Sequence, residues 1–304
     1  MKRRMSVLLV IALVLGMSSF VAAHDPPGEL FFMVQFPDNA VPTIDGDFGD
    51  WSIVPDNPYA IGQDKLFDPA QFQQAGRGQF DPSDINIRHR MGWNDSFNKI
   101  YFATEIFDNV HSIDRADPAR HWYDDNWEVG VNPDATPSEE HSRNVEDIPI
   151  NDFFYKFVVP PLGGIYSSME PVGDLAWLQD GGEFIEFGWS FTGEQFGEST
   201  YRYELAVTPI ESMPRDNATT EDQVVEHNLE EEEIIHISLT VGDIDEPTTG
   251  DFVLESYQGF WTLSPESCCT ATNDFVMAPV EPSIADLSAT AVEEVTWGQI
   301  KAGF

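Results

Sequence analysis

Carboxylates, histidines and a tryptophan crowd one short polar segment between two stretches of alternating apolar residues. Its ionisable and aromatic side chains are Asp108, His111, Asp114, Asp117, His121, Trp122, Asp124 and Asp125. An aromatic ring offers a flat apolar surface, and charged groups beside it make strong hydrogen bonds to hydroxyl groups. A pair of strands that closes around carboxylates and an aromatic ring indicates a place for a ligand.

A second acidic group surrounds a turn near the start of the chain, in the run VPTIDGDFGDW. Asp45, Asp47 and Asp50 lie at short spacing around Gly46, and Asp45-Gly46 is a turn signal. Calcium takes six to eight oxygen ligands, mostly from carboxylates and carbonyls. We therefore predict a structural calcium held by these three residues and by Asp124. The alternative is a merely solvated acidic surface, because the chain has 53 Asp and Glu residues.

Catalytic patterns are weak by comparison. The pair Asp124 and Glu128 has the residue types of a glycosidase, but such pairs carry little information in so acidic a chain. His111 and His121, with Asp124, could hold a transition metal, although histidines in polar loops are more often surface residues. The sequence has no HExxH, GxSxG or CxxC motif. We therefore predict no catalytic activity.

The elements that would position these residues read as strands. Alternating apolar residues mark runs of period two over 85–93, 100–107, 127–131, 201–207 and 235–241. Asn94 to Asn98 forms a turn signal between the first two runs, and 184–191 with 201–207 predicts another hairpin. Residues 55–83 and 211–233 lack this period and are predicted to be loops. Many short strands at hairpin spacing, with few helical patterns, predict an all-β sandwich.

The first residues predict export. Residues 1–23 combine a basic start, an apolar stretch and small residues at Val21 to Ala23, which is the pattern of a cleaved signal peptide. An uncleaved anchor is the alternative. We expect a secreted, periplasmic or cell-surface protein without a membrane span once the signal is removed. The net charge of −38 argues against nucleic acid and anionic membranes as partners.

The remaining chain divides by composition. Residues 24–39 form an N-terminal extension or first strand, 40–282 form the sandwich, and 283–304 form a tail in which 285–300 predict a short helix. Cys268 and Cys269 are adjacent, and a bridge between neighbours is strained, so no disulfide framework is predicted.

The order of several short motifs resembles the family 9 carbohydrate-binding modules. The motifs are PTIDGDFGDW at 42–51, WND at 93–95, IYFATEIFDNVH at 100–111, WYDDNWEVGVN at 122–132, YRYELAVTP at 201–209, ISLTVGDIDE at 237–246 and FW at 260–261. This resemblance covers roughly residues 40–280. It implies a jelly-roll-type sandwich of antiparallel strands with few short helices, structural calcium, a sugar or polysaccharide ligand, and a link to carbohydrate catabolism. It also implies at most an accessory role to glycoside hydrolases, with a carbohydrate-active enzyme or a surface assembly as the partner.

Site residues follow from the resemblance by position. Trp122 matches the first of two tryptophans that clamp a terminal sugar. Asp125 and Glu128 match its acidic followers, Asp108 the acidic end of the preceding strand, and Lys156 a basic residue of the next strand. The chain departs from the pattern at the second clamp, where it has SCCT at 267–270 and no aromatic residue before Phe275.

Two alternative functions stay open at this point. One is a structural or cell-surface sandwich that has lost its ligand and binds no sugar. The other is a haem-binding electron-transfer relative of the same fold, with ligands such as His89 and Met91.

Overall fold

The computed structural model describes most of the region predicted to fold. It describes residues 26, 28–68, 81–115, 117, 120–136, 149–163, 165–170, 184–215, 220–246, 258–265 and 271–285. The predicted signal peptide, the Cys268–Cys269 pair and all but the start of the C-terminal tail lie outside this set. Within the described part of the chain, no helix is long and apolar enough to cross a membrane.

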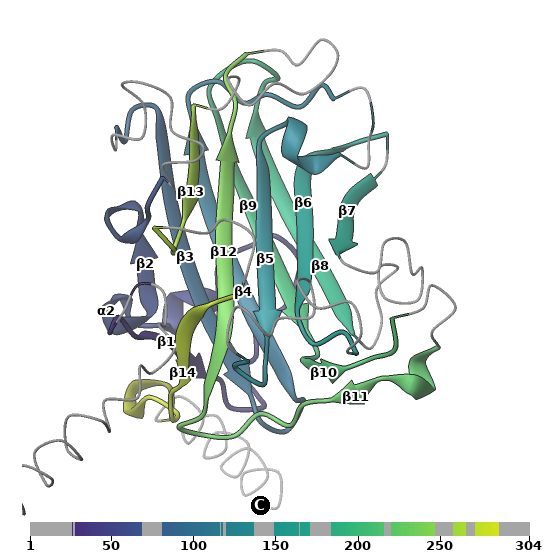
Figure 1. The fold of residues 1–304 in the computed structure, drawn as a ribbon. Coiled ribbons are helices and arrows are strands. Elements are labelled where there is room, and N and C mark those ends of the chain that lie inside the picture. Colours follow the sequence, from purple (N-terminus) through teal and green to yellow (C-terminus); the bar gives the residue numbers. More distant parts are fainter. Residues whose placement is uncertain are drawn as a thin grey trace, which may run out of the picture.

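The described chain is built almost entirely of strands (Figure 1). They are β1 (Phe31–Gln35), β2 (Ala60–Gly62), β3 (Ile85–Asn94), β4 (Lys99–Asp108), β5 (Asn126–Asn132), β6 (Phe153–Leu162), β7 (Ile165–Glu170), β8 (Ile185–Gly193), β9 (Ser199–Val207), β10 (Ile210–Ser212), β11 (Val225–Glu226), β12 (Ile234–Asp243), β13 (Gly259–Thr262) and β14 (Asn273–Met277). The helical elements are short: α2 (Asp56–Tyr59) and the 3-10 turns η1 (Asp50–Ile53), η2 (Gln63–Lys65), η3 (His121–Tyr123) and η5 (Glu221–Gln223).

These strands form two layers joined by one strand. Sheet A has the order β7-β6-β5-β12-β14, with β13 beside β12, and sheet B has the order β3-β4-β9-β8, with β2 beside β3. β1 lies between the sheets and pairs with both β14 and β3 in parallel. All other pairings are antiparallel. The all-β sandwich is therefore confirmed, with β1 as its parallel exception.

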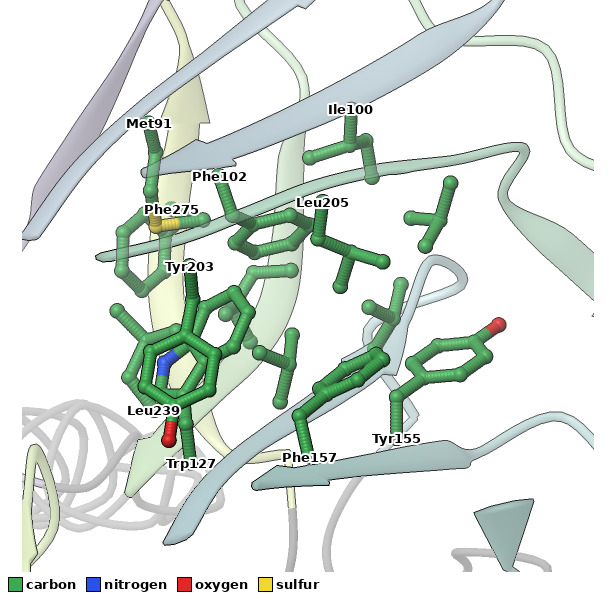
Figure 2. Packing of buried hydrophobic residues seen from close by; sticks show 14 of the residues in the cluster. Met91, Ile100, Phe102, Trp127, Tyr155, Phe157, Tyr203, Leu205, Leu239 and Phe275 are labelled. Atoms are coloured by element: carbon green, nitrogen blue, oxygen red, sulfur yellow. The ribbon is translucent and has the colours of Figure 1, made fainter. Parts of the chain in front are cut away.

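The main core lies between the two sheets, because alternate residues of each strand point inward. The Trp127 ring packs against Phe102, Phe157 and Tyr203, with ring centroids 5.2 to 6.4 Å apart. Figure 2 shows this group with its neighbours from both layers. The alternation predicted over 100–107 and 127–131 sets this inward face.

A second, smaller core covers the outer face of sheet B. Tyr101 and Ala103 of β4 pack there under Phe36, Trp51 and other residues from the N-terminal segment. Phe36 meets Trp51 and Tyr101 edge to face, with centroids 5.4 and 5.8 Å apart. Both faces of β4 are therefore buried.

The predicted hairpins are confirmed in register. β3 and β4 pair from Ile85–Asp108 to Asn94–Lys99, and β8 pairs with β9 along its length. The two predicted loops contain more structure than expected. Residues 60–62 form β2 on the edge of β3, and 210–212 pair with 225–226 as a small ribbon. These strands are two or three residues long, too short to show a period in the sequence.

Candidate functional site

Three of the predicted ligand residues meet on the outer face of sheet A. Glu128 on β5 pairs in register with Lys156 on β6, and the Lys156 ammonium lies 3.7 Å from Glu128 Oε1. The same ammonium lies 4.8 Å from the centroid of the Trp122 ring, which η3 places beside β6. The structure thus joins an aromatic ring, a cation and a carboxylate from three elements.

Strand alternation explains this meeting. Trp127 and Val129 of β5 and Phe157 of β6 point into the core, so Glu128 and Lys156 must point to the opposite face. Phe154 shares that face, and its ring centroid lies 5.9 Å from the Lys156 ammonium.

The site is closed at its base and open at its rim. Glu128 is 1% exposed and Lys156 is 6% exposed, whereas Trp122 and Tyr123 are partly exposed. The Arg120 guanidinium lies 5.4 Å from the Trp122 ring centroid and 5.7 Å from that of Tyr123. Because its side chain is 48% exposed, Arg120 can leave the ring at small cost, while Lys156 is enclosed.

A row of polar residues continues from this site across sheet A. Glu128 is in register with Thr240 of β12, and Thr240 with Thr262 of β13. Ser238 lies on the same face, and all three hydroxyl residues are fully buried. This row was not predicted from the sequence. Its signal is the set of polar residues that alternate with apolar ones over 237–241.

The other two predicted ligand residues lie elsewhere. Asp108 and Asp125 are fully buried at one end of the sandwich, where β4 ends and β5 begins. Asp108 accepts hydrogen bonds from the Val110 amide at 2.8 Å and the Tyr201 hydroxyl at 3.2 Å. Asp125 accepts the amides of Ser112 and Ile244, at 2.5 and 2.7 Å.

Charge accumulates in this second cluster. Burial, and after it the neighbouring Asp108 carboxylate, raise the pKa of Asp125 well above its usual range. Asp243, at the end of β12, has its pKa raised well above normal by burial and by the charges of Asp125 and Asp108. Burial also raises the pKa of the Tyr201 hydroxyl well above its usual range. The cluster therefore disfavours further negative charge.

Asp124 holds the loop that contains Asp114 and Arg115 in place. Its carboxylate accepts the amides of Asp114 and Arg115 at 2.9 and 3.0 Å, and the buried Arg115 guanidinium lies 2.5 Å from it. Burial raises the pKa of Asp124, although Arg115 and the two amides act in the opposite direction.

The turn at Asp45-Gly46 is tied down by a residue from sheet B. The buried Glu204 carboxylate of β9 accepts the Asp45 and Gly46 amides at 3.0 and 2.6 Å and the Trp51 indole N–H at 2.7 Å. Burial raises the pKa of Glu204. Gly46 has a φ of 83°, and an added Cβ would lie 2.3 Å from the Trp189 backbone, so this turn requires glycine.

The predicted calcium ligands do not converge. Asp45, Asp47 and Asp50 are exposed, and each accepts a backbone amide of its own turn: those of Asp47, Gly49 and Thr43. Among the described residues, acidic and histidine ligand atoms lie within 4.8 Å of one another in two other groups: Asp108, His111 and Asp125, and Asp108, Asp243 and Asp245. The donor set predicted from the sequence therefore does not fit one calcium ion.

His89 is a core residue. Its Nδ1 lies 2.7 Å from the Thr104 hydroxyl, it is fully buried, and burial lowers its pKa to about 3. Met91 packs in the same inward row of β3. His121 is buried at the start of η3.

The second aromatic clamp falls on residues 267–270, outside the described residues. Trp261, the tryptophan of the preceding strand, is buried in the main core.

No family model and no curated protein matches the chain. Its fold is similar to solved structures of carbohydrate-binding modules of family 9. A family 9 module from Caldicellulosiruptor kristjanssonii in complex with cellotriose is 11% identical, with a TM-score of 0.49, over 84% of this chain and 96% of that one. The glucose complex of a family 9 module from the same organism is 13% identical, with a TM-score of 0.48, over 84% and 98% of the two chains. A protein from Bacteroides uniformis to which carbohydrate binding has been attributed is 11% identical, with a TM-score of 0.47, over 82% and 98%.

Proposed function

We propose that this chain is a non-catalytic carbohydrate-binding protein whose site is the Trp122–Lys156–Glu128 group. The observation that carries the proposal is the convergence of a partly exposed indole, an ammonium and a carboxylate from η3, β6 and β5. A sugar needs an apolar plane for its C–H face and charged partners for its hydroxyls, and these three side chains supply both.

Arg120 adds a replaceable contact to the site. A sugar that stacks on Trp122 takes the place of the half-exposed guanidinium, while Lys156 stays beside Glu128 and donates to a ring hydroxyl. Displacing a solvated surface cation costs little, because exposed ion contacts contribute about 0–1 kcal/mol.

Binding to immobilised polysaccharides tests the site. Affinity gel electrophoresis of the protein with cellulose-, xylan- and glucan-type polymers should show retardation, and Trp122→Ala should weaken the affinity roughly 10- to 100-fold, as expected for one lost aromatic anchor. Trp189→Ala is the matched control, because Trp189 is 36% exposed on β8 and lies outside the site. Unchanged retardation of the Trp122 variant would exclude this site.

A second pair of variants separates stacking from charge. Lys156→Met keeps the length of the side chain and removes the ammonium, so sugar binding should weaken, and its melting curve measures the cost of removing the cation beside the buried Glu128. Arg120→Ala should leave binding equal or slightly tighter. If no polymer binds the unmodified chain, the group is a structural contact of a surface sandwich.

Export and partnership extend this proposal. The basic and apolar N-terminal residues support secretion with cleavage after Ala23, and a carbohydrate-active enzyme or a surface assembly would be the partner. The mass of the exported chain tests the cleavage. Calcium stays a prediction, to be checked by melting the protein with Ca²⁺ and with a calcium-selective chelator.

A further inference from the structure

A buried cluster of acids at one end of the sandwich is not used by the proposed sugar site. Asp108 ends β4 of sheet B, whereas Asp125 precedes β5 and Asp243 ends β12, both in sheet A. Their exposed fractions are 0, 0 and 2%. The carboxylates meet where the two layers close on each other, so whatever holds them together also ties sheet A to sheet B.

His111 is aimed into this cluster by a fixed orientation. Its Nε2 lies 2.8 Å from the Val159 carbonyl, and because a carbonyl only accepts, this nitrogen carries the proton. The ring also packs against Phe191 and Tyr201, with centroids 5.0 and 4.6 Å away. Metal-binding histidines are commonly held in this way, with the non-ligating N–H donated to a carbonyl.

The opposite nitrogen of His111 has no hydrogen-bond partner. Nδ1 is fully buried and lies 3.3 Å from Asp125 Oδ2 and 3.8 Å from Asp108 Oδ2. In the neutral imidazole, this lone pair faces carboxylate oxygens that are also rich in electrons. Two ligand groups that share Asp108 therefore converge here: Asp108, His111 and Asp125, and Asp108, Asp243 and Asp245.

Apart from His111, the hydrogen-bond donors to Asp108 and Asp125 are neutral groups. Asp108 and Asp125 receive three backbone amides and the Tyr201 hydroxyl. The buried guanidinium of the same loop, Arg115, is 2.5 Å from Asp124. Buried carboxylates in such numbers require a cation or protons.

We propose that Asp108, His111 and Asp125 bind one divalent transition-metal ion, of the Zn²⁺ or Mn²⁺ class, that links the two sheets. An imidazole nitrogen beside carboxylates suits these ions, whereas calcium takes oxygen ligands. The site lies apart from Asp45, Asp47 and Asp50, and it goes beyond the proposed sugar function.

Metal content and thermal stability test the site in the full chain. After stripping with chelator and exposure to Zn²⁺ or Mn²⁺, elemental analysis should find about one tightly held ion per chain. At a hundredfold excess over Kd, the ion should raise Tm by roughly 5–10 °C, because it binds only the folded state. Absence of a bound ion and of any Tm increase would overturn the proposal.

Substitutions locate the ion and exclude general binding to the acidic surface. Asp108→Asn removes one ligand and also relieves charge repulsion, so the stripped protein should stay folded while the Tm gain is lost. His111→Gln should lose the response to Zn²⁺. His89→Gln is the matched control, because His89 is equally buried but bonded to Thr104, and it should keep the full response.

Two outcomes would contradict the assignment. A metal response that survives both Asp108→Asn and His111→Gln would place the ion elsewhere. An equal Tm gain with Ca²⁺ that His111→Gln leaves intact would exclude the transition-metal class.

Discussion

Two buried carboxylate sites of this sandwich differ in how their negative charge is stabilised. Glu204 is alone, and its two oxygens receive three N–H donors from the Asp45–Gly46 turn and Trp51. The cluster around Asp108 places several carboxylates together with fewer donors for each. The number of donors per carboxylate, and not the number of acids nearby in sequence, decides where a cation is needed.

The stability of the protein should fall more when Glu204 loses its charge than when an acid of the Asp108 cluster does. Glu204→Gln leaves one acceptor oxygen for three N–H donors, so we expect a loss of roughly 3 kcal/mol in the free energy of unfolding. Urea unfolding measures it. Glu186→Gln, on the neighbouring strand with a side chain 55% exposed, is the control and should change stability by less than about 0.5 kcal/mol. If Glu204→Gln and Glu186→Gln changed the free energy of unfolding equally, the three N–H donors would not make Glu204 important for stability.

His89 extends the comparison to a buried base. Its folded-state pKa of about 3 lies below the unfolded value of 6.5, so the unfolded chain binds more protons. The stability contribution of neutral His89 is therefore complete above pH 6.5 and is lost as the pH falls toward 3. We expect a cost of roughly 2 kcal/mol at pH 5 relative to pH 7. His89→Gln should lack this part of the acid sensitivity in parallel urea titrations.

The acids of the Asp45–Asp50 turn should matter less. Each accepts one backbone amide at the surface, and asparagine keeps one acceptor oxygen. The variant Asp45→Asn/Asp47→Asn/Asp50→Asn should lose less than about 1 kcal/mol. If calcium raises Tm in the parent and this variant abolishes the rise, the turn binds calcium despite its geometry.

His227 should give the smallest effect, of opposite sign to His89. Its Nε2 lies 2.8 Å from Glu233, and this hydrogen bond is the main cause of its raised pKa. The stabilisation is therefore complete below pH 6.5 and declines as the pH rises through the folded-state pKa. We expect less than about 1 kcal/mol. His227→Gln should differ from the parent below pH 6.5 and approach it at higher pH.

Much of the fold was readable from local patterns. Alternation over 85–93, 100–107 and 201–207 identified β3, β4 and β9 and their inward residues. The parallel pairing of β1 was not readable, because β14 lies more than two hundred positions away and nothing local indicates which strand edge is free. Burial of the outer face of β4 was missed for the same reason, since the covering residues come from a distant segment.

The candidate site was partly readable. Trp122, Glu128 and Lys156 were named from the resemblance, and the structure brings them together. β4 and β12 each end at an aspartate, and Asp125 directly precedes β5. These aspartates meet because β5 pairs with β12, although about one hundred residues separate the two strands in the sequence. Asp124 and Asp125 are neighbours in the sequence, but their side chains point to different partners. Asp124 contacts Arg115, and Asp125 faces His111.

The parallel strand β1 also constrains when this protein can fold. β1 is made well before its partner β14, which is the last strand of the described chain (Figure 1). A fold closed by such a distant pairing has a high contact order, which slows folding. The sandwich can therefore close only after β14 has left the ribosome, and until then β1 cannot join the two sheets.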